Sequence, residues 1–242
     1  MSDEQKIIIA LDVSSKEEMI RLLKNVNVPG SYVKVGMELY MQEGADIVRY
    51  LKANGFSVFL DLKLHDIPHT VNRAMKGLAK LGADMINVHA AGGSEMMRAA
   101  VEGLGEGAIA AKPICLAVTQ LTSTDQKMLE NELLIKQPIN NVISSYASLA
   151  YSSGLDGVVC SAWEAASIKA RTSPDFLAVT PGIRLNNDAV GDQKRVATPA
   201  KARNLGSDYI VVGRSITAAA DPENAFQRVL EDWRNESWKT KN

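Results

Sequence analysis

The chain has 242 residues, of which 46% are hydrophobic and 23% are charged, a composition typical of a folded globular protein rather than a disordered one. The formal net charge is −1, so the chain lacks the basic excess that nucleic-acid-binding proteins carry. Cys115 and Cys160 are the two cysteines, and both stand in apolar runs. This excludes a disulfide framework and predicts two buried free thiols.

The apolar runs of the sequence predict a cytoplasmic protein without membrane association. The first run begins at Ile7 and is cut by Asp12, so it is too short for the apolar region of a signal peptide. The longest candidate, residues 108–118, is interrupted by Lys112 and Pro113. It therefore falls well short of the roughly 18 residues needed to span a bilayer.

Strand-like and helix-like segments alternate along the whole chain. Short runs rich in β-branched residues begin near Ile7, Tyr32, Ser57, Ala83, Pro113, Gly157, Phe176 and Asp208. Amphipathic segments with helical spacing lie at residues 15–25, 39–54, 70–81, 94–102, 140–153, 163–171, 199–205 and 222–233. Parallel strands need crossover connections, so this alternation predicts an α/β protein with a parallel sheet.

The spacing of these segments favours one closed barrel over an open doubly wound sheet. The strand starts recur without a linker-like stretch, and no self-similarity in sequence is evident between the repeats. We predict a single (β/α)8 TIM barrel domain over residues 1–242. Two long loops follow the fifth and seventh strands, at residues 122–138 and 185–199, and are candidate lids at the carboxyl end of the barrel.

The third predicted strand ends in a cluster of charged residues. Asp61 and Lys63 are two positions apart, so they share one face of the strand and are expected to point into the barrel, with Asp66 close behind. The same alternation predicts inward ionic groups at the ends of the first, second and eighth strands: Asp12, Lys34 and Arg214, the last in phase with Ile210 and Val212. A lysine and aspartate network at a barrel mouth is typical of a catalytic site.

The ends of the seventh and eighth strands predict a phosphate site. Arg184 follows a Thr-Pro-Gly-Ile sequence, and Gly213 precedes Arg214. Taken alone, a turn glycine and an exposed arginine would explain such a pair, but phosphate sites in this fold are often built from these two loops. Gly213 permits close approach of an oxyanion, and a guanidinium can bind it bidentately.

Three other motifs give weaker evidence of a functional site. His65 and His69 could share a helix face, but Pro68 separates them and no further histidine or cysteine supports a metal site, so we expect a structural role. His89 is interpreted as a hydrogen-bonded strand-end histidine. The glycines of residues 103–107 lack the preceding strand of a dinucleotide-binding motif.

The charged motifs together resemble those of a known family. They are Ala10-Leu-Asp12, Lys34-Val-Gly36, Asp61-x-Lys63-x-x-Asp66-Ile67-Pro68-x-Thr70, Thr180-Pro-Gly-Ile-Arg184 and Val212-Gly-Arg214. This set closely resembles orotidine 5′-phosphate decarboxylase of the bacterial type, over essentially the whole chain. The resemblance implies a homodimeric barrel that converts orotidine 5′-monophosphate to uridine 5′-monophosphate, the last step of pyrimidine synthesis, without a cofactor or a metal.

The resemblance also implies a role for individual residues. Lys63 would donate the proton to C6 of the pyrimidine, within a charge network of Asp61, Lys34 and Asp66. The implied substrate contacts are Asp12 and Lys34 to the ribose, Thr122 to the base, and Arg184, Gln193, Gly213 and Arg214 to the phosphate. Asp66 and Thr70 would reach across the dimer interface into the partner's site, so that each active site is composite.

Two alternatives from other functional classes remain open at this point. A magnesium-dependent sugar-phosphate lyase of the same superfamily would share the Asp-x-Lys-x-x-Asp motif, although the Ile67-Pro68-x-Thr70 continuation favours the nucleotide enzyme. A non-catalytic nucleotide-phosphate-binding barrel could keep Arg214 but would have no need of Lys63 between two carboxylates. A metal requirement separates the first alternative from the decarboxylase, and turnover separates the second.

Overall fold

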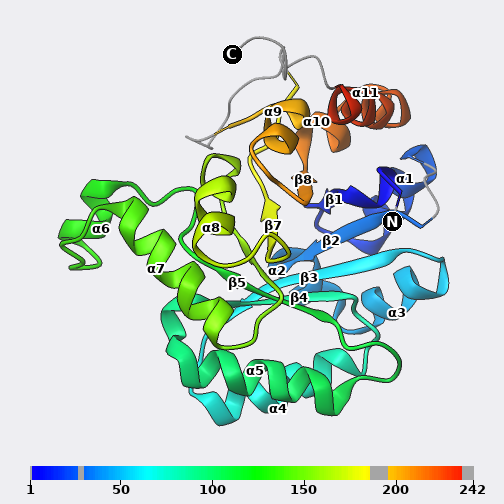
Figure 1. Ribbon diagram of the computed structural model, residues 1–242. Coiled ribbons are helices and arrows are strands. Elements are labelled where there is room, and N and C mark those ends of the chain that lie inside the picture. The colour runs from blue at the N-terminus through cyan, green and yellow to red at the C-terminus, as the bar shows by residue number, and fades with distance from the viewer. Residues whose placement is uncertain (1, 27–29, 186–195, 236–242) are drawn as a thin grey trace.

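Eight parallel strands close into a barrel in the computed structural model, which describes residues 2–26, 30–185 and 196–235 (Figure 1). The strands are β1 (Ile7–Leu11), β2 (Tyr32–Gly36), β3 (Ser57–Leu64), β4 (Met85–His89), β5 (Ile114–Val118), β6 (Gly157–Val159), β7 (Leu177–Thr180) and β8 (Tyr209–Val212). Each strand pairs with its neighbour in sequence, and β8 pairs with β1. The predicted (β/α)8 barrel is confirmed.

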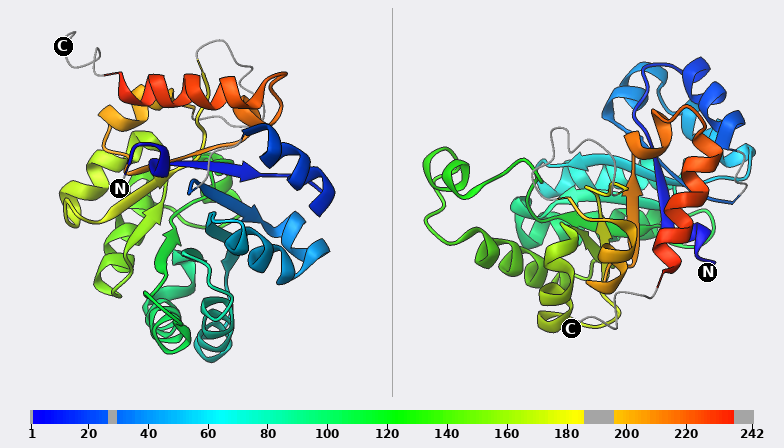
Figure 2. Two further views of the ribbon diagram at one scale, coloured as in Figure 1. Left: turned by 90° about the vertical axis from the view of Figure 1, so that its right-hand side faces the viewer. Right: turned by 90° about the horizontal axis from the view of Figure 1, so that it is seen from above.

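The helices form a layer around the outside of the barrel (Figure 2). They are α1 (Lys16–Val26), α2 (Met37–Glu43), α3 (Asp46–Ala53), α4 (Pro68–Ala79), α5 (Gly93–Gly107), α6 (Gln126–Asn131), α7 (Ile139–Ser152), α8 (Ala165–Arg171), α9 (Pro199–Asn204), α10 (Arg214–Thr217) and α11 (Pro222–Arg234), with short 3₁₀ helices at Glu4–Lys6, Ala90–Gly92 and Ala162–Glu164. Within the described ranges, none of them is long and apolar enough to cross a membrane.

Three features of the helical layer differ from the prediction. The segment 39–54 forms two helices rather than one, because Gly44 ends α2 with a φ of +66°, a conformation that breaks a right-handed helix. The loop after β5 contains α6, which buries Leu129 and projects beside α7 (Figure 1). A short helix, α10, starts directly after β8.

Apolar side chains fill two separate layers. Strand residues that point inward form the barrel interior: Ile8, Ala10, Tyr32, Phe59, Met85, Leu116, Val179, Tyr209 and Val211. The alternate strand residues pack outward against the helices. Both cysteines are buried thiols, as predicted.

The phase predicted for the eighth strand is wrong. Ile210 and Val212 pack outward into the helical layer, whereas Tyr209 and Val211 point inward. Gly213 follows the inward phase, and Arg214 already belongs to α10. Both faces of this strand are apolar, so the sequence pattern does not distinguish them, and pairing with β7 and β1 sets the phase.

A Gly-x-Asp tripeptide recurs at the amino-terminal end of the barrel. It corrects the prediction that the repeats show no self-similarity in sequence. It precedes three of the even-numbered strands, at residues 82–84, 154–156 and 206–208. Each glycine has a positive φ, between +82° and +98°, and so permits the turn from helix to strand. The tripeptide therefore marks the junction at which three helices end and three strands begin.

The aspartates of this repeat clamp neighbouring strands together. Each carboxylate accepts a backbone N–H at 2.7 Å from the second residue of the preceding odd-numbered strand: Asp84 from Val58, Asp156 from Cys115 and Asp208 from Ala178. Each also pairs with a lysine: Lys52 at 2.6 Å, Lys112 at 3.2 Å and Lys169 at 2.8 Å. Three copies of one structural device thus join adjacent strands.

Two of the three glycines at residues 103–107 allow two helices to pack closely. A Cβ atom on Gly103 or Gly107 would overlap the backbone carbonyl groups of Asn72 and Lys76 on α4. These two glycines let α5 approach α4 closely, in agreement with the rejection of a dinucleotide site.

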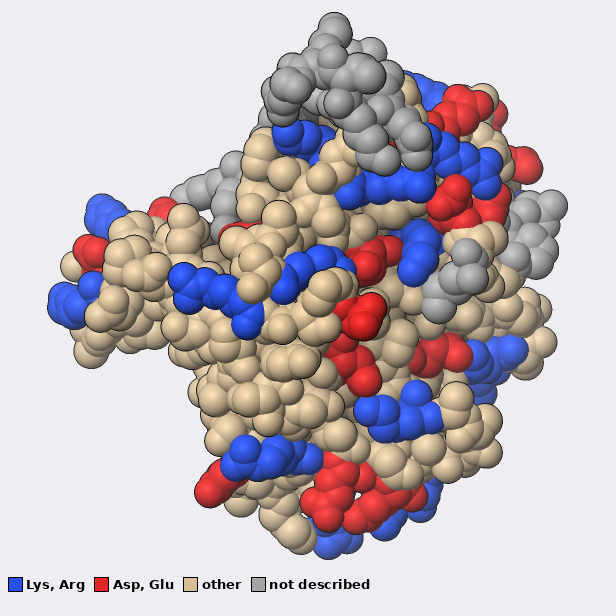
Figure 3. All heavy atoms as spheres, in the orientation of Figure 1, with Lys and Arg blue, Asp and Glu red and all other residues tan. Residues whose placement is uncertain are grey.

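The charges on the surface do not segregate by sign on the face shown in Figure 3. Lysine and arginine side chains alternate there with aspartate and glutamate side chains. This mixture matches the net charge of −1 and gives that face no extended basic patch.

Candidate active site

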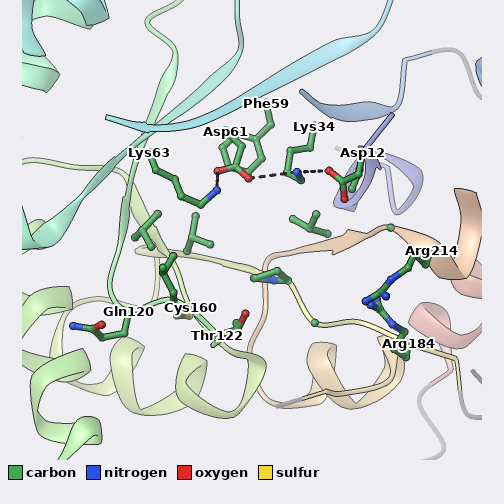
Figure 4. A pocket seen from close by; sticks show the side chains of 18 residues that line it. Asp12, Lys34, Phe59, Asp61, Lys63, Gln120, Thr122, Cys160, Arg184 and Arg214 are labelled. Carbon is green, nitrogen blue, oxygen red and sulfur yellow. Dashed lines mark hydrogen bonds and ion pairs between the residues drawn. The ribbon is translucent and has the colours of Figure 1, made fainter. Parts of the chain in front are cut away.

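A cavity of about 530 Å³ opens among the carboxyl ends of the strands. The predicted site residues that line it are Asp12, Lys34, Asp61, Lys63, Thr122, Arg184, Gly213 and Arg214 (Figure 4). They come from the position directly after β1, from β2 and β3, from the loops after β5 and β7, and from the β8–α10 junction. The closed barrel therefore brings together side chains that lie up to 202 residues apart in sequence.

Four charged side chains form one alternating chain along a wall of the cavity (Figure 4). Lys34 Nζ lies 3.0 Å from Asp12 Oδ1 and 3.4 Å from Asp61 Oδ2. The other oxygen of Asp61 accepts a hydrogen bond from Lys63 Nζ at 2.7 Å. Lys34 and Asp61 are the most enclosed of the four, with side-chain exposures of 13% and 11%.

The enclosed pair at the centre of this chain stabilises its own ionisation. Burial alone would raise the pKa of Asp61, but the charges of Lys34 and Lys63 and hydrogen bonds from Lys63 and Asn87 outweigh it, and the pKa is lowered. Burial alone would lower the pKa of Lys34, but the carboxylates of Asp61 and Asp12 outweigh it, and the pKa is raised. Both groups are therefore charged near neutral pH.

Two guanidinium groups face the cavity from its opposite side (Figure 4). Arg184 is buried and donates a hydrogen bond from Nη1 to the carbonyl oxygen of Ile183 at 2.8 Å. Arg214 is exposed at the start of α10, directly after Gly213. Two converging guanidinium groups beside a glycine suit a phosphate dianion, which accepts several charge-assisted hydrogen bonds.

Thr122 lines the cavity between these two charged regions (Figure 4). Gln120 and Cys160 lie near it, and neither was predicted. Asn87 was also missed, although it stands in phase with Met85 on the inward face of β4. A polar residue at an inward position within an apolar strand was the signal that could have identified it.

Three predicted site residues are not among those lining the cavity. Asp66 and Thr70 are exposed at the start of α4, and Asp66 Oδ1 accepts the backbone N–H of Ile67 at 2.7 Å. Gln193 lies outside the described residues, as does most of the loop 185–199. The lid roles of this loop and of residues 122–138 stay predictions.

Two of the three histidines lie close to one another and near Lys63. The rings of His65 and His89 are 5.7 Å apart, centroid to centroid. Burial, followed by electrostatic interaction with His65 and with Lys63, lowers the pKa of His89, so the neutral form of this ring is favoured near pH 7. The described part of the chain brings together no three acidic, histidine or cysteine side chains suited to holding a metal ion.

Comparison with known proteins gives consistent matches over nearly the whole chain. Residues 5–229 match the family described as orotidine 5′-phosphate decarboxylase / HUMPS family. The chain is 60% identical over 228 residues to an orotidine 5′-phosphate decarboxylase of Bacillus caldolyticus, covering 93% of each protein. It is 52% identical over 231 residues to that of Bacillus cereus, covering 95% of this chain and 97% of the relative.

A solved structure supports the same conclusion. The crystal structure of orotidine 5′-phosphate decarboxylase from Lactobacillus acidophilus aligns with a TM-score of 0.87 at 41% identity, covering 96% of this chain and all of that one. Fold, charged cavity and sequence matches all agree. This chain belongs to the orotidine 5′-phosphate decarboxylase / HUMPS family.

Proposed function

We propose that this chain decarboxylates orotidine 5′-monophosphate to uridine 5′-monophosphate, without a metal or a cofactor. The observation that carries the proposal is the cavity itself. In it, the row of paired charges Asp12–Lys34–Asp61–Lys63 faces the guanidinium groups of Arg184 and Arg214. One wall supplies an ammonium for the reacting carbon, and the other binds a phosphate. The names of the relatives that match over most of the chain support the same reaction.

The reaction needs a cation next to the carbon that loses CO₂. The bond between C6 and its carboxylate carbon breaks, CO₂ leaves, and the electron pair stays on C6. That pair lies in the plane of the ring and is not conjugated with its π electrons, so no electron sink relieves the charge. The Lys63 ammonium stabilises it and then donates a proton to C6.

The phosphate-binding residues, called the phosphate grip below, add binding energy at a distance from the reacting carbon. Arg184 and Arg214 would hold the 5′-phosphate, Asp12 and Lys34 the ribose hydroxyls, and Thr122 the base. Binding energy from such remote contacts can hold the pyrimidine against Lys63 and exclude water from the site. Gln193 is proposed to join the phosphate grip.

Turnover of orotidine 5′-monophosphate, followed by ultraviolet absorbance with and without a chelator, tests the proposal. We expect full activity after exhaustive chelation. Activity that returns only with added magnesium would assign the chain to the sugar-phosphate lyases. Binding of uridine 5′-monophosphate without any turnover would indicate a non-catalytic nucleotide-binding barrel.

We further propose a cytoplasmic homodimer with composite active sites. Asp66 and Thr70 are exposed and do not line the cavity of their own chain. Large apolar side chains are also exposed on the segments that follow β2 and β3: Met37 and Met41 on α2 at 51% and 74%, and Ile67 at 66%. A second copy covering this surface would bury these side chains and bring Asp66 to the partner's cavity. The two buried thiols support a reducing compartment.

Hybrid dimers test the composite site. We expect Lys63→Ala and Asp66→Ala each to be nearly inactive alone, and their co-expression to restore activity. In each hybrid, one site collects both substitutions and the other collects neither, because the interface is isologous. Confirmed hybrid dimers without activity would contradict the composite site.

A further inference from the structure

Lys63, the proposed proton donor, lies in an irregular part of strand β3. Leu60 of β3 pairs with Ile86 of β4, but the next pairing joins Leu64 to Val88. The β3 strand therefore carries extra residues between these points, which is a bulge. Lys63 lies within it with a φ of +52°, in the left-handed region that residues other than glycine seldom adopt.

One buried side chain on the neighbouring strand β4 forms hydrogen bonds with both Lys63 and Asp61. Asn87 has 0% exposure. Its Oδ1 accepts the backbone N–H of Lys63 at 2.8 Å, and its Nδ2 donates to Asp61 Oδ1 at 2.7 Å. That same carboxylate oxygen accepts the hydrogen bond from Lys63 Nζ at 2.7 Å. A single planar amide is thus tied to the backbone of Lys63 and to the partner of its ammonium.

The chemistry at this position calls for an asparagine. The bulge removes the Lys63 N–H from the strand ladder, so a side-chain acceptor must satisfy it. Asp61 needs a donor on the same side. An amide offers both an acceptor and a donor, whereas an ionised carboxylate only accepts and would repel Asp61. A leucine would leave the Lys63 N–H without an acceptor and would remove one of the donors to Asp61.

We propose that Asn87 is a positioning residue for the decarboxylation, which holds the Lys63 backbone in its left-handed conformation and fixes Asp61 so that the ammonium points into the cavity. The inference rests on the proposed function. Asn87 does not itself line the cavity, and it acts through Lys63 and Asp61. Arg184 and Arg214 lie across the cavity from Lys63 (Figure 4), so substitution of Asn87 should leave the phosphate contacts in place.

The first test separates kcat from KM. Because a small misplacement of a reacting group can cost about 100-fold in rate, we expect Asn87→Ala to lower kcat by about that factor. The KM for orotidine 5′-monophosphate should change by less than about threefold, because the phosphate contacts remain. The control is Ser153→Ala at the amino-terminal end of the barrel, which removes the hydrogen bond from the buried Ser153 Oγ to the carbonyl oxygen of Leu149 and should keep the wild-type kcat.

The second test uses the protonation of a substituted side chain. In Asn87→Asp, a protonated carboxyl group offers a donor to Asp61 and an acceptor to Lys63, whereas the ionised group offers no donor. The ratio of variant to wild-type kcat should therefore rise as the pH falls. Dividing by the wild-type value at each pH cancels titration of the surrounding groups, which are Lys34, Asp61, Lys63, His65 and His89.

Each outcome decides the proposal. A wild-type kcat in Asn87→Ala, an effect confined to KM, or an equal loss of kcat in Ser153→Ala would overturn it. If Asn87→Ala does not fold, Asn87→Asp decides: a ratio near one at high pH, or a ratio that does not rise on acidification, overturns it. A wild-type protein without turnover would refute the proposed function instead, and the inference with it.

Discussion

Lysine–aspartate pairs occur at both ends of this barrel, but their surroundings differ. At the carboxyl end, Asp12, Lys34, Asp61 and Lys63 bond to one another in a continuous chain along a cavity of about 530 Å³. At the amino end, the pairs are separate, and each carboxylate also accepts a backbone N–H at 2.7 Å. One end presents its charges to a ligand, and the other uses them to join strands.

The difference shows that the role of an ion pair in this barrel depends on the other groups that its carboxylate contacts. An aspartate that also binds the backbone of the neighbouring strand has a structural role. An aspartate shared between two lysines beside an open cavity leaves an ammonium available to a ligand. Substitutions at the carboxyl end should therefore change rates, and substitutions at the amino end should change stability.

The largest effect is expected at Lys63. Lys63→Ala removes both the cation next to C6 and the proton donor, so kcat should fall by about 10⁴-fold or more. Binding of uridine 5′-monophosphate and the melting temperature should change little, which steady-state kinetics, calorimetric titration and thermal unfolding would show. An intact decarboxylation rate in the pure variant would refute the role of Lys63.

Arg214 should give the next largest effect, and one restricted to the phosphorylated substrate. Arg214→Ala should lower kcat/KM for orotidine 5′-monophosphate by roughly 100-fold, because a charge-assisted bidentate contact is lost. Turnover of orotidine, which has no phosphate, should be nearly unchanged. The exposed Arg228 on α11 provides a control, since Arg228→Ala should leave both substrates unaffected. Equal losses for the two substrates would mean that Arg214 supports the barrel.

At the amino end, Asp156 should affect stability alone. Asp156→Ala leaves the N–H of Cys115 without its acceptor and should lower the free energy of unfolding by about 1–3 kcal/mol, with kcat and KM unchanged. Lys112→Gln removes only the partly exposed ion-pair partner and should cost less than about 1 kcal/mol. Urea unfolding of both variants checks the order. A lower kcat in folded Asp156→Ala would remove the distinction between the two ends.

The smallest effect is a dependence of stability on pH at the carboxyl end. The lowered pKa of Asp61 means that its ionisation stabilises the folded state above the ordinary aspartate pKa, and that this contribution is lost as the pH falls through the folded value. The stability difference between wild type and Asp61→Asn should therefore shrink below about pH 4. Lys34, whose pKa is raised, should lose its contribution only in strong alkali. A difference that grows on acidification would contradict the charge chain.

The sequence by itself determined the barrel and most of the cavity. Strand and helix periods are local properties, so the alternation of segments predicted all eight strands to within a few residues. In a parallel barrel every strand ends at the same rim, and Asp12, Lys34, Asp61 and Lys63 could therefore be placed together without a structure. The break at Gly44 was not predicted, because a helical pattern tolerates a single glycine.

Only the tertiary structure decided the features that depend on how strands pair. The phase of β8 comes from its neighbours, because apolar residues occupy both of its faces. The bulge at Lys63 and its bond to Asn87, 24 residues later in the sequence, arise from the register between β3 and β4. The strand clamps of Asp84, Asp156 and Asp208 likewise join separate segments. Hydrogen bonds between distant segments follow from register and closure of the barrel, which no local sequence pattern encodes.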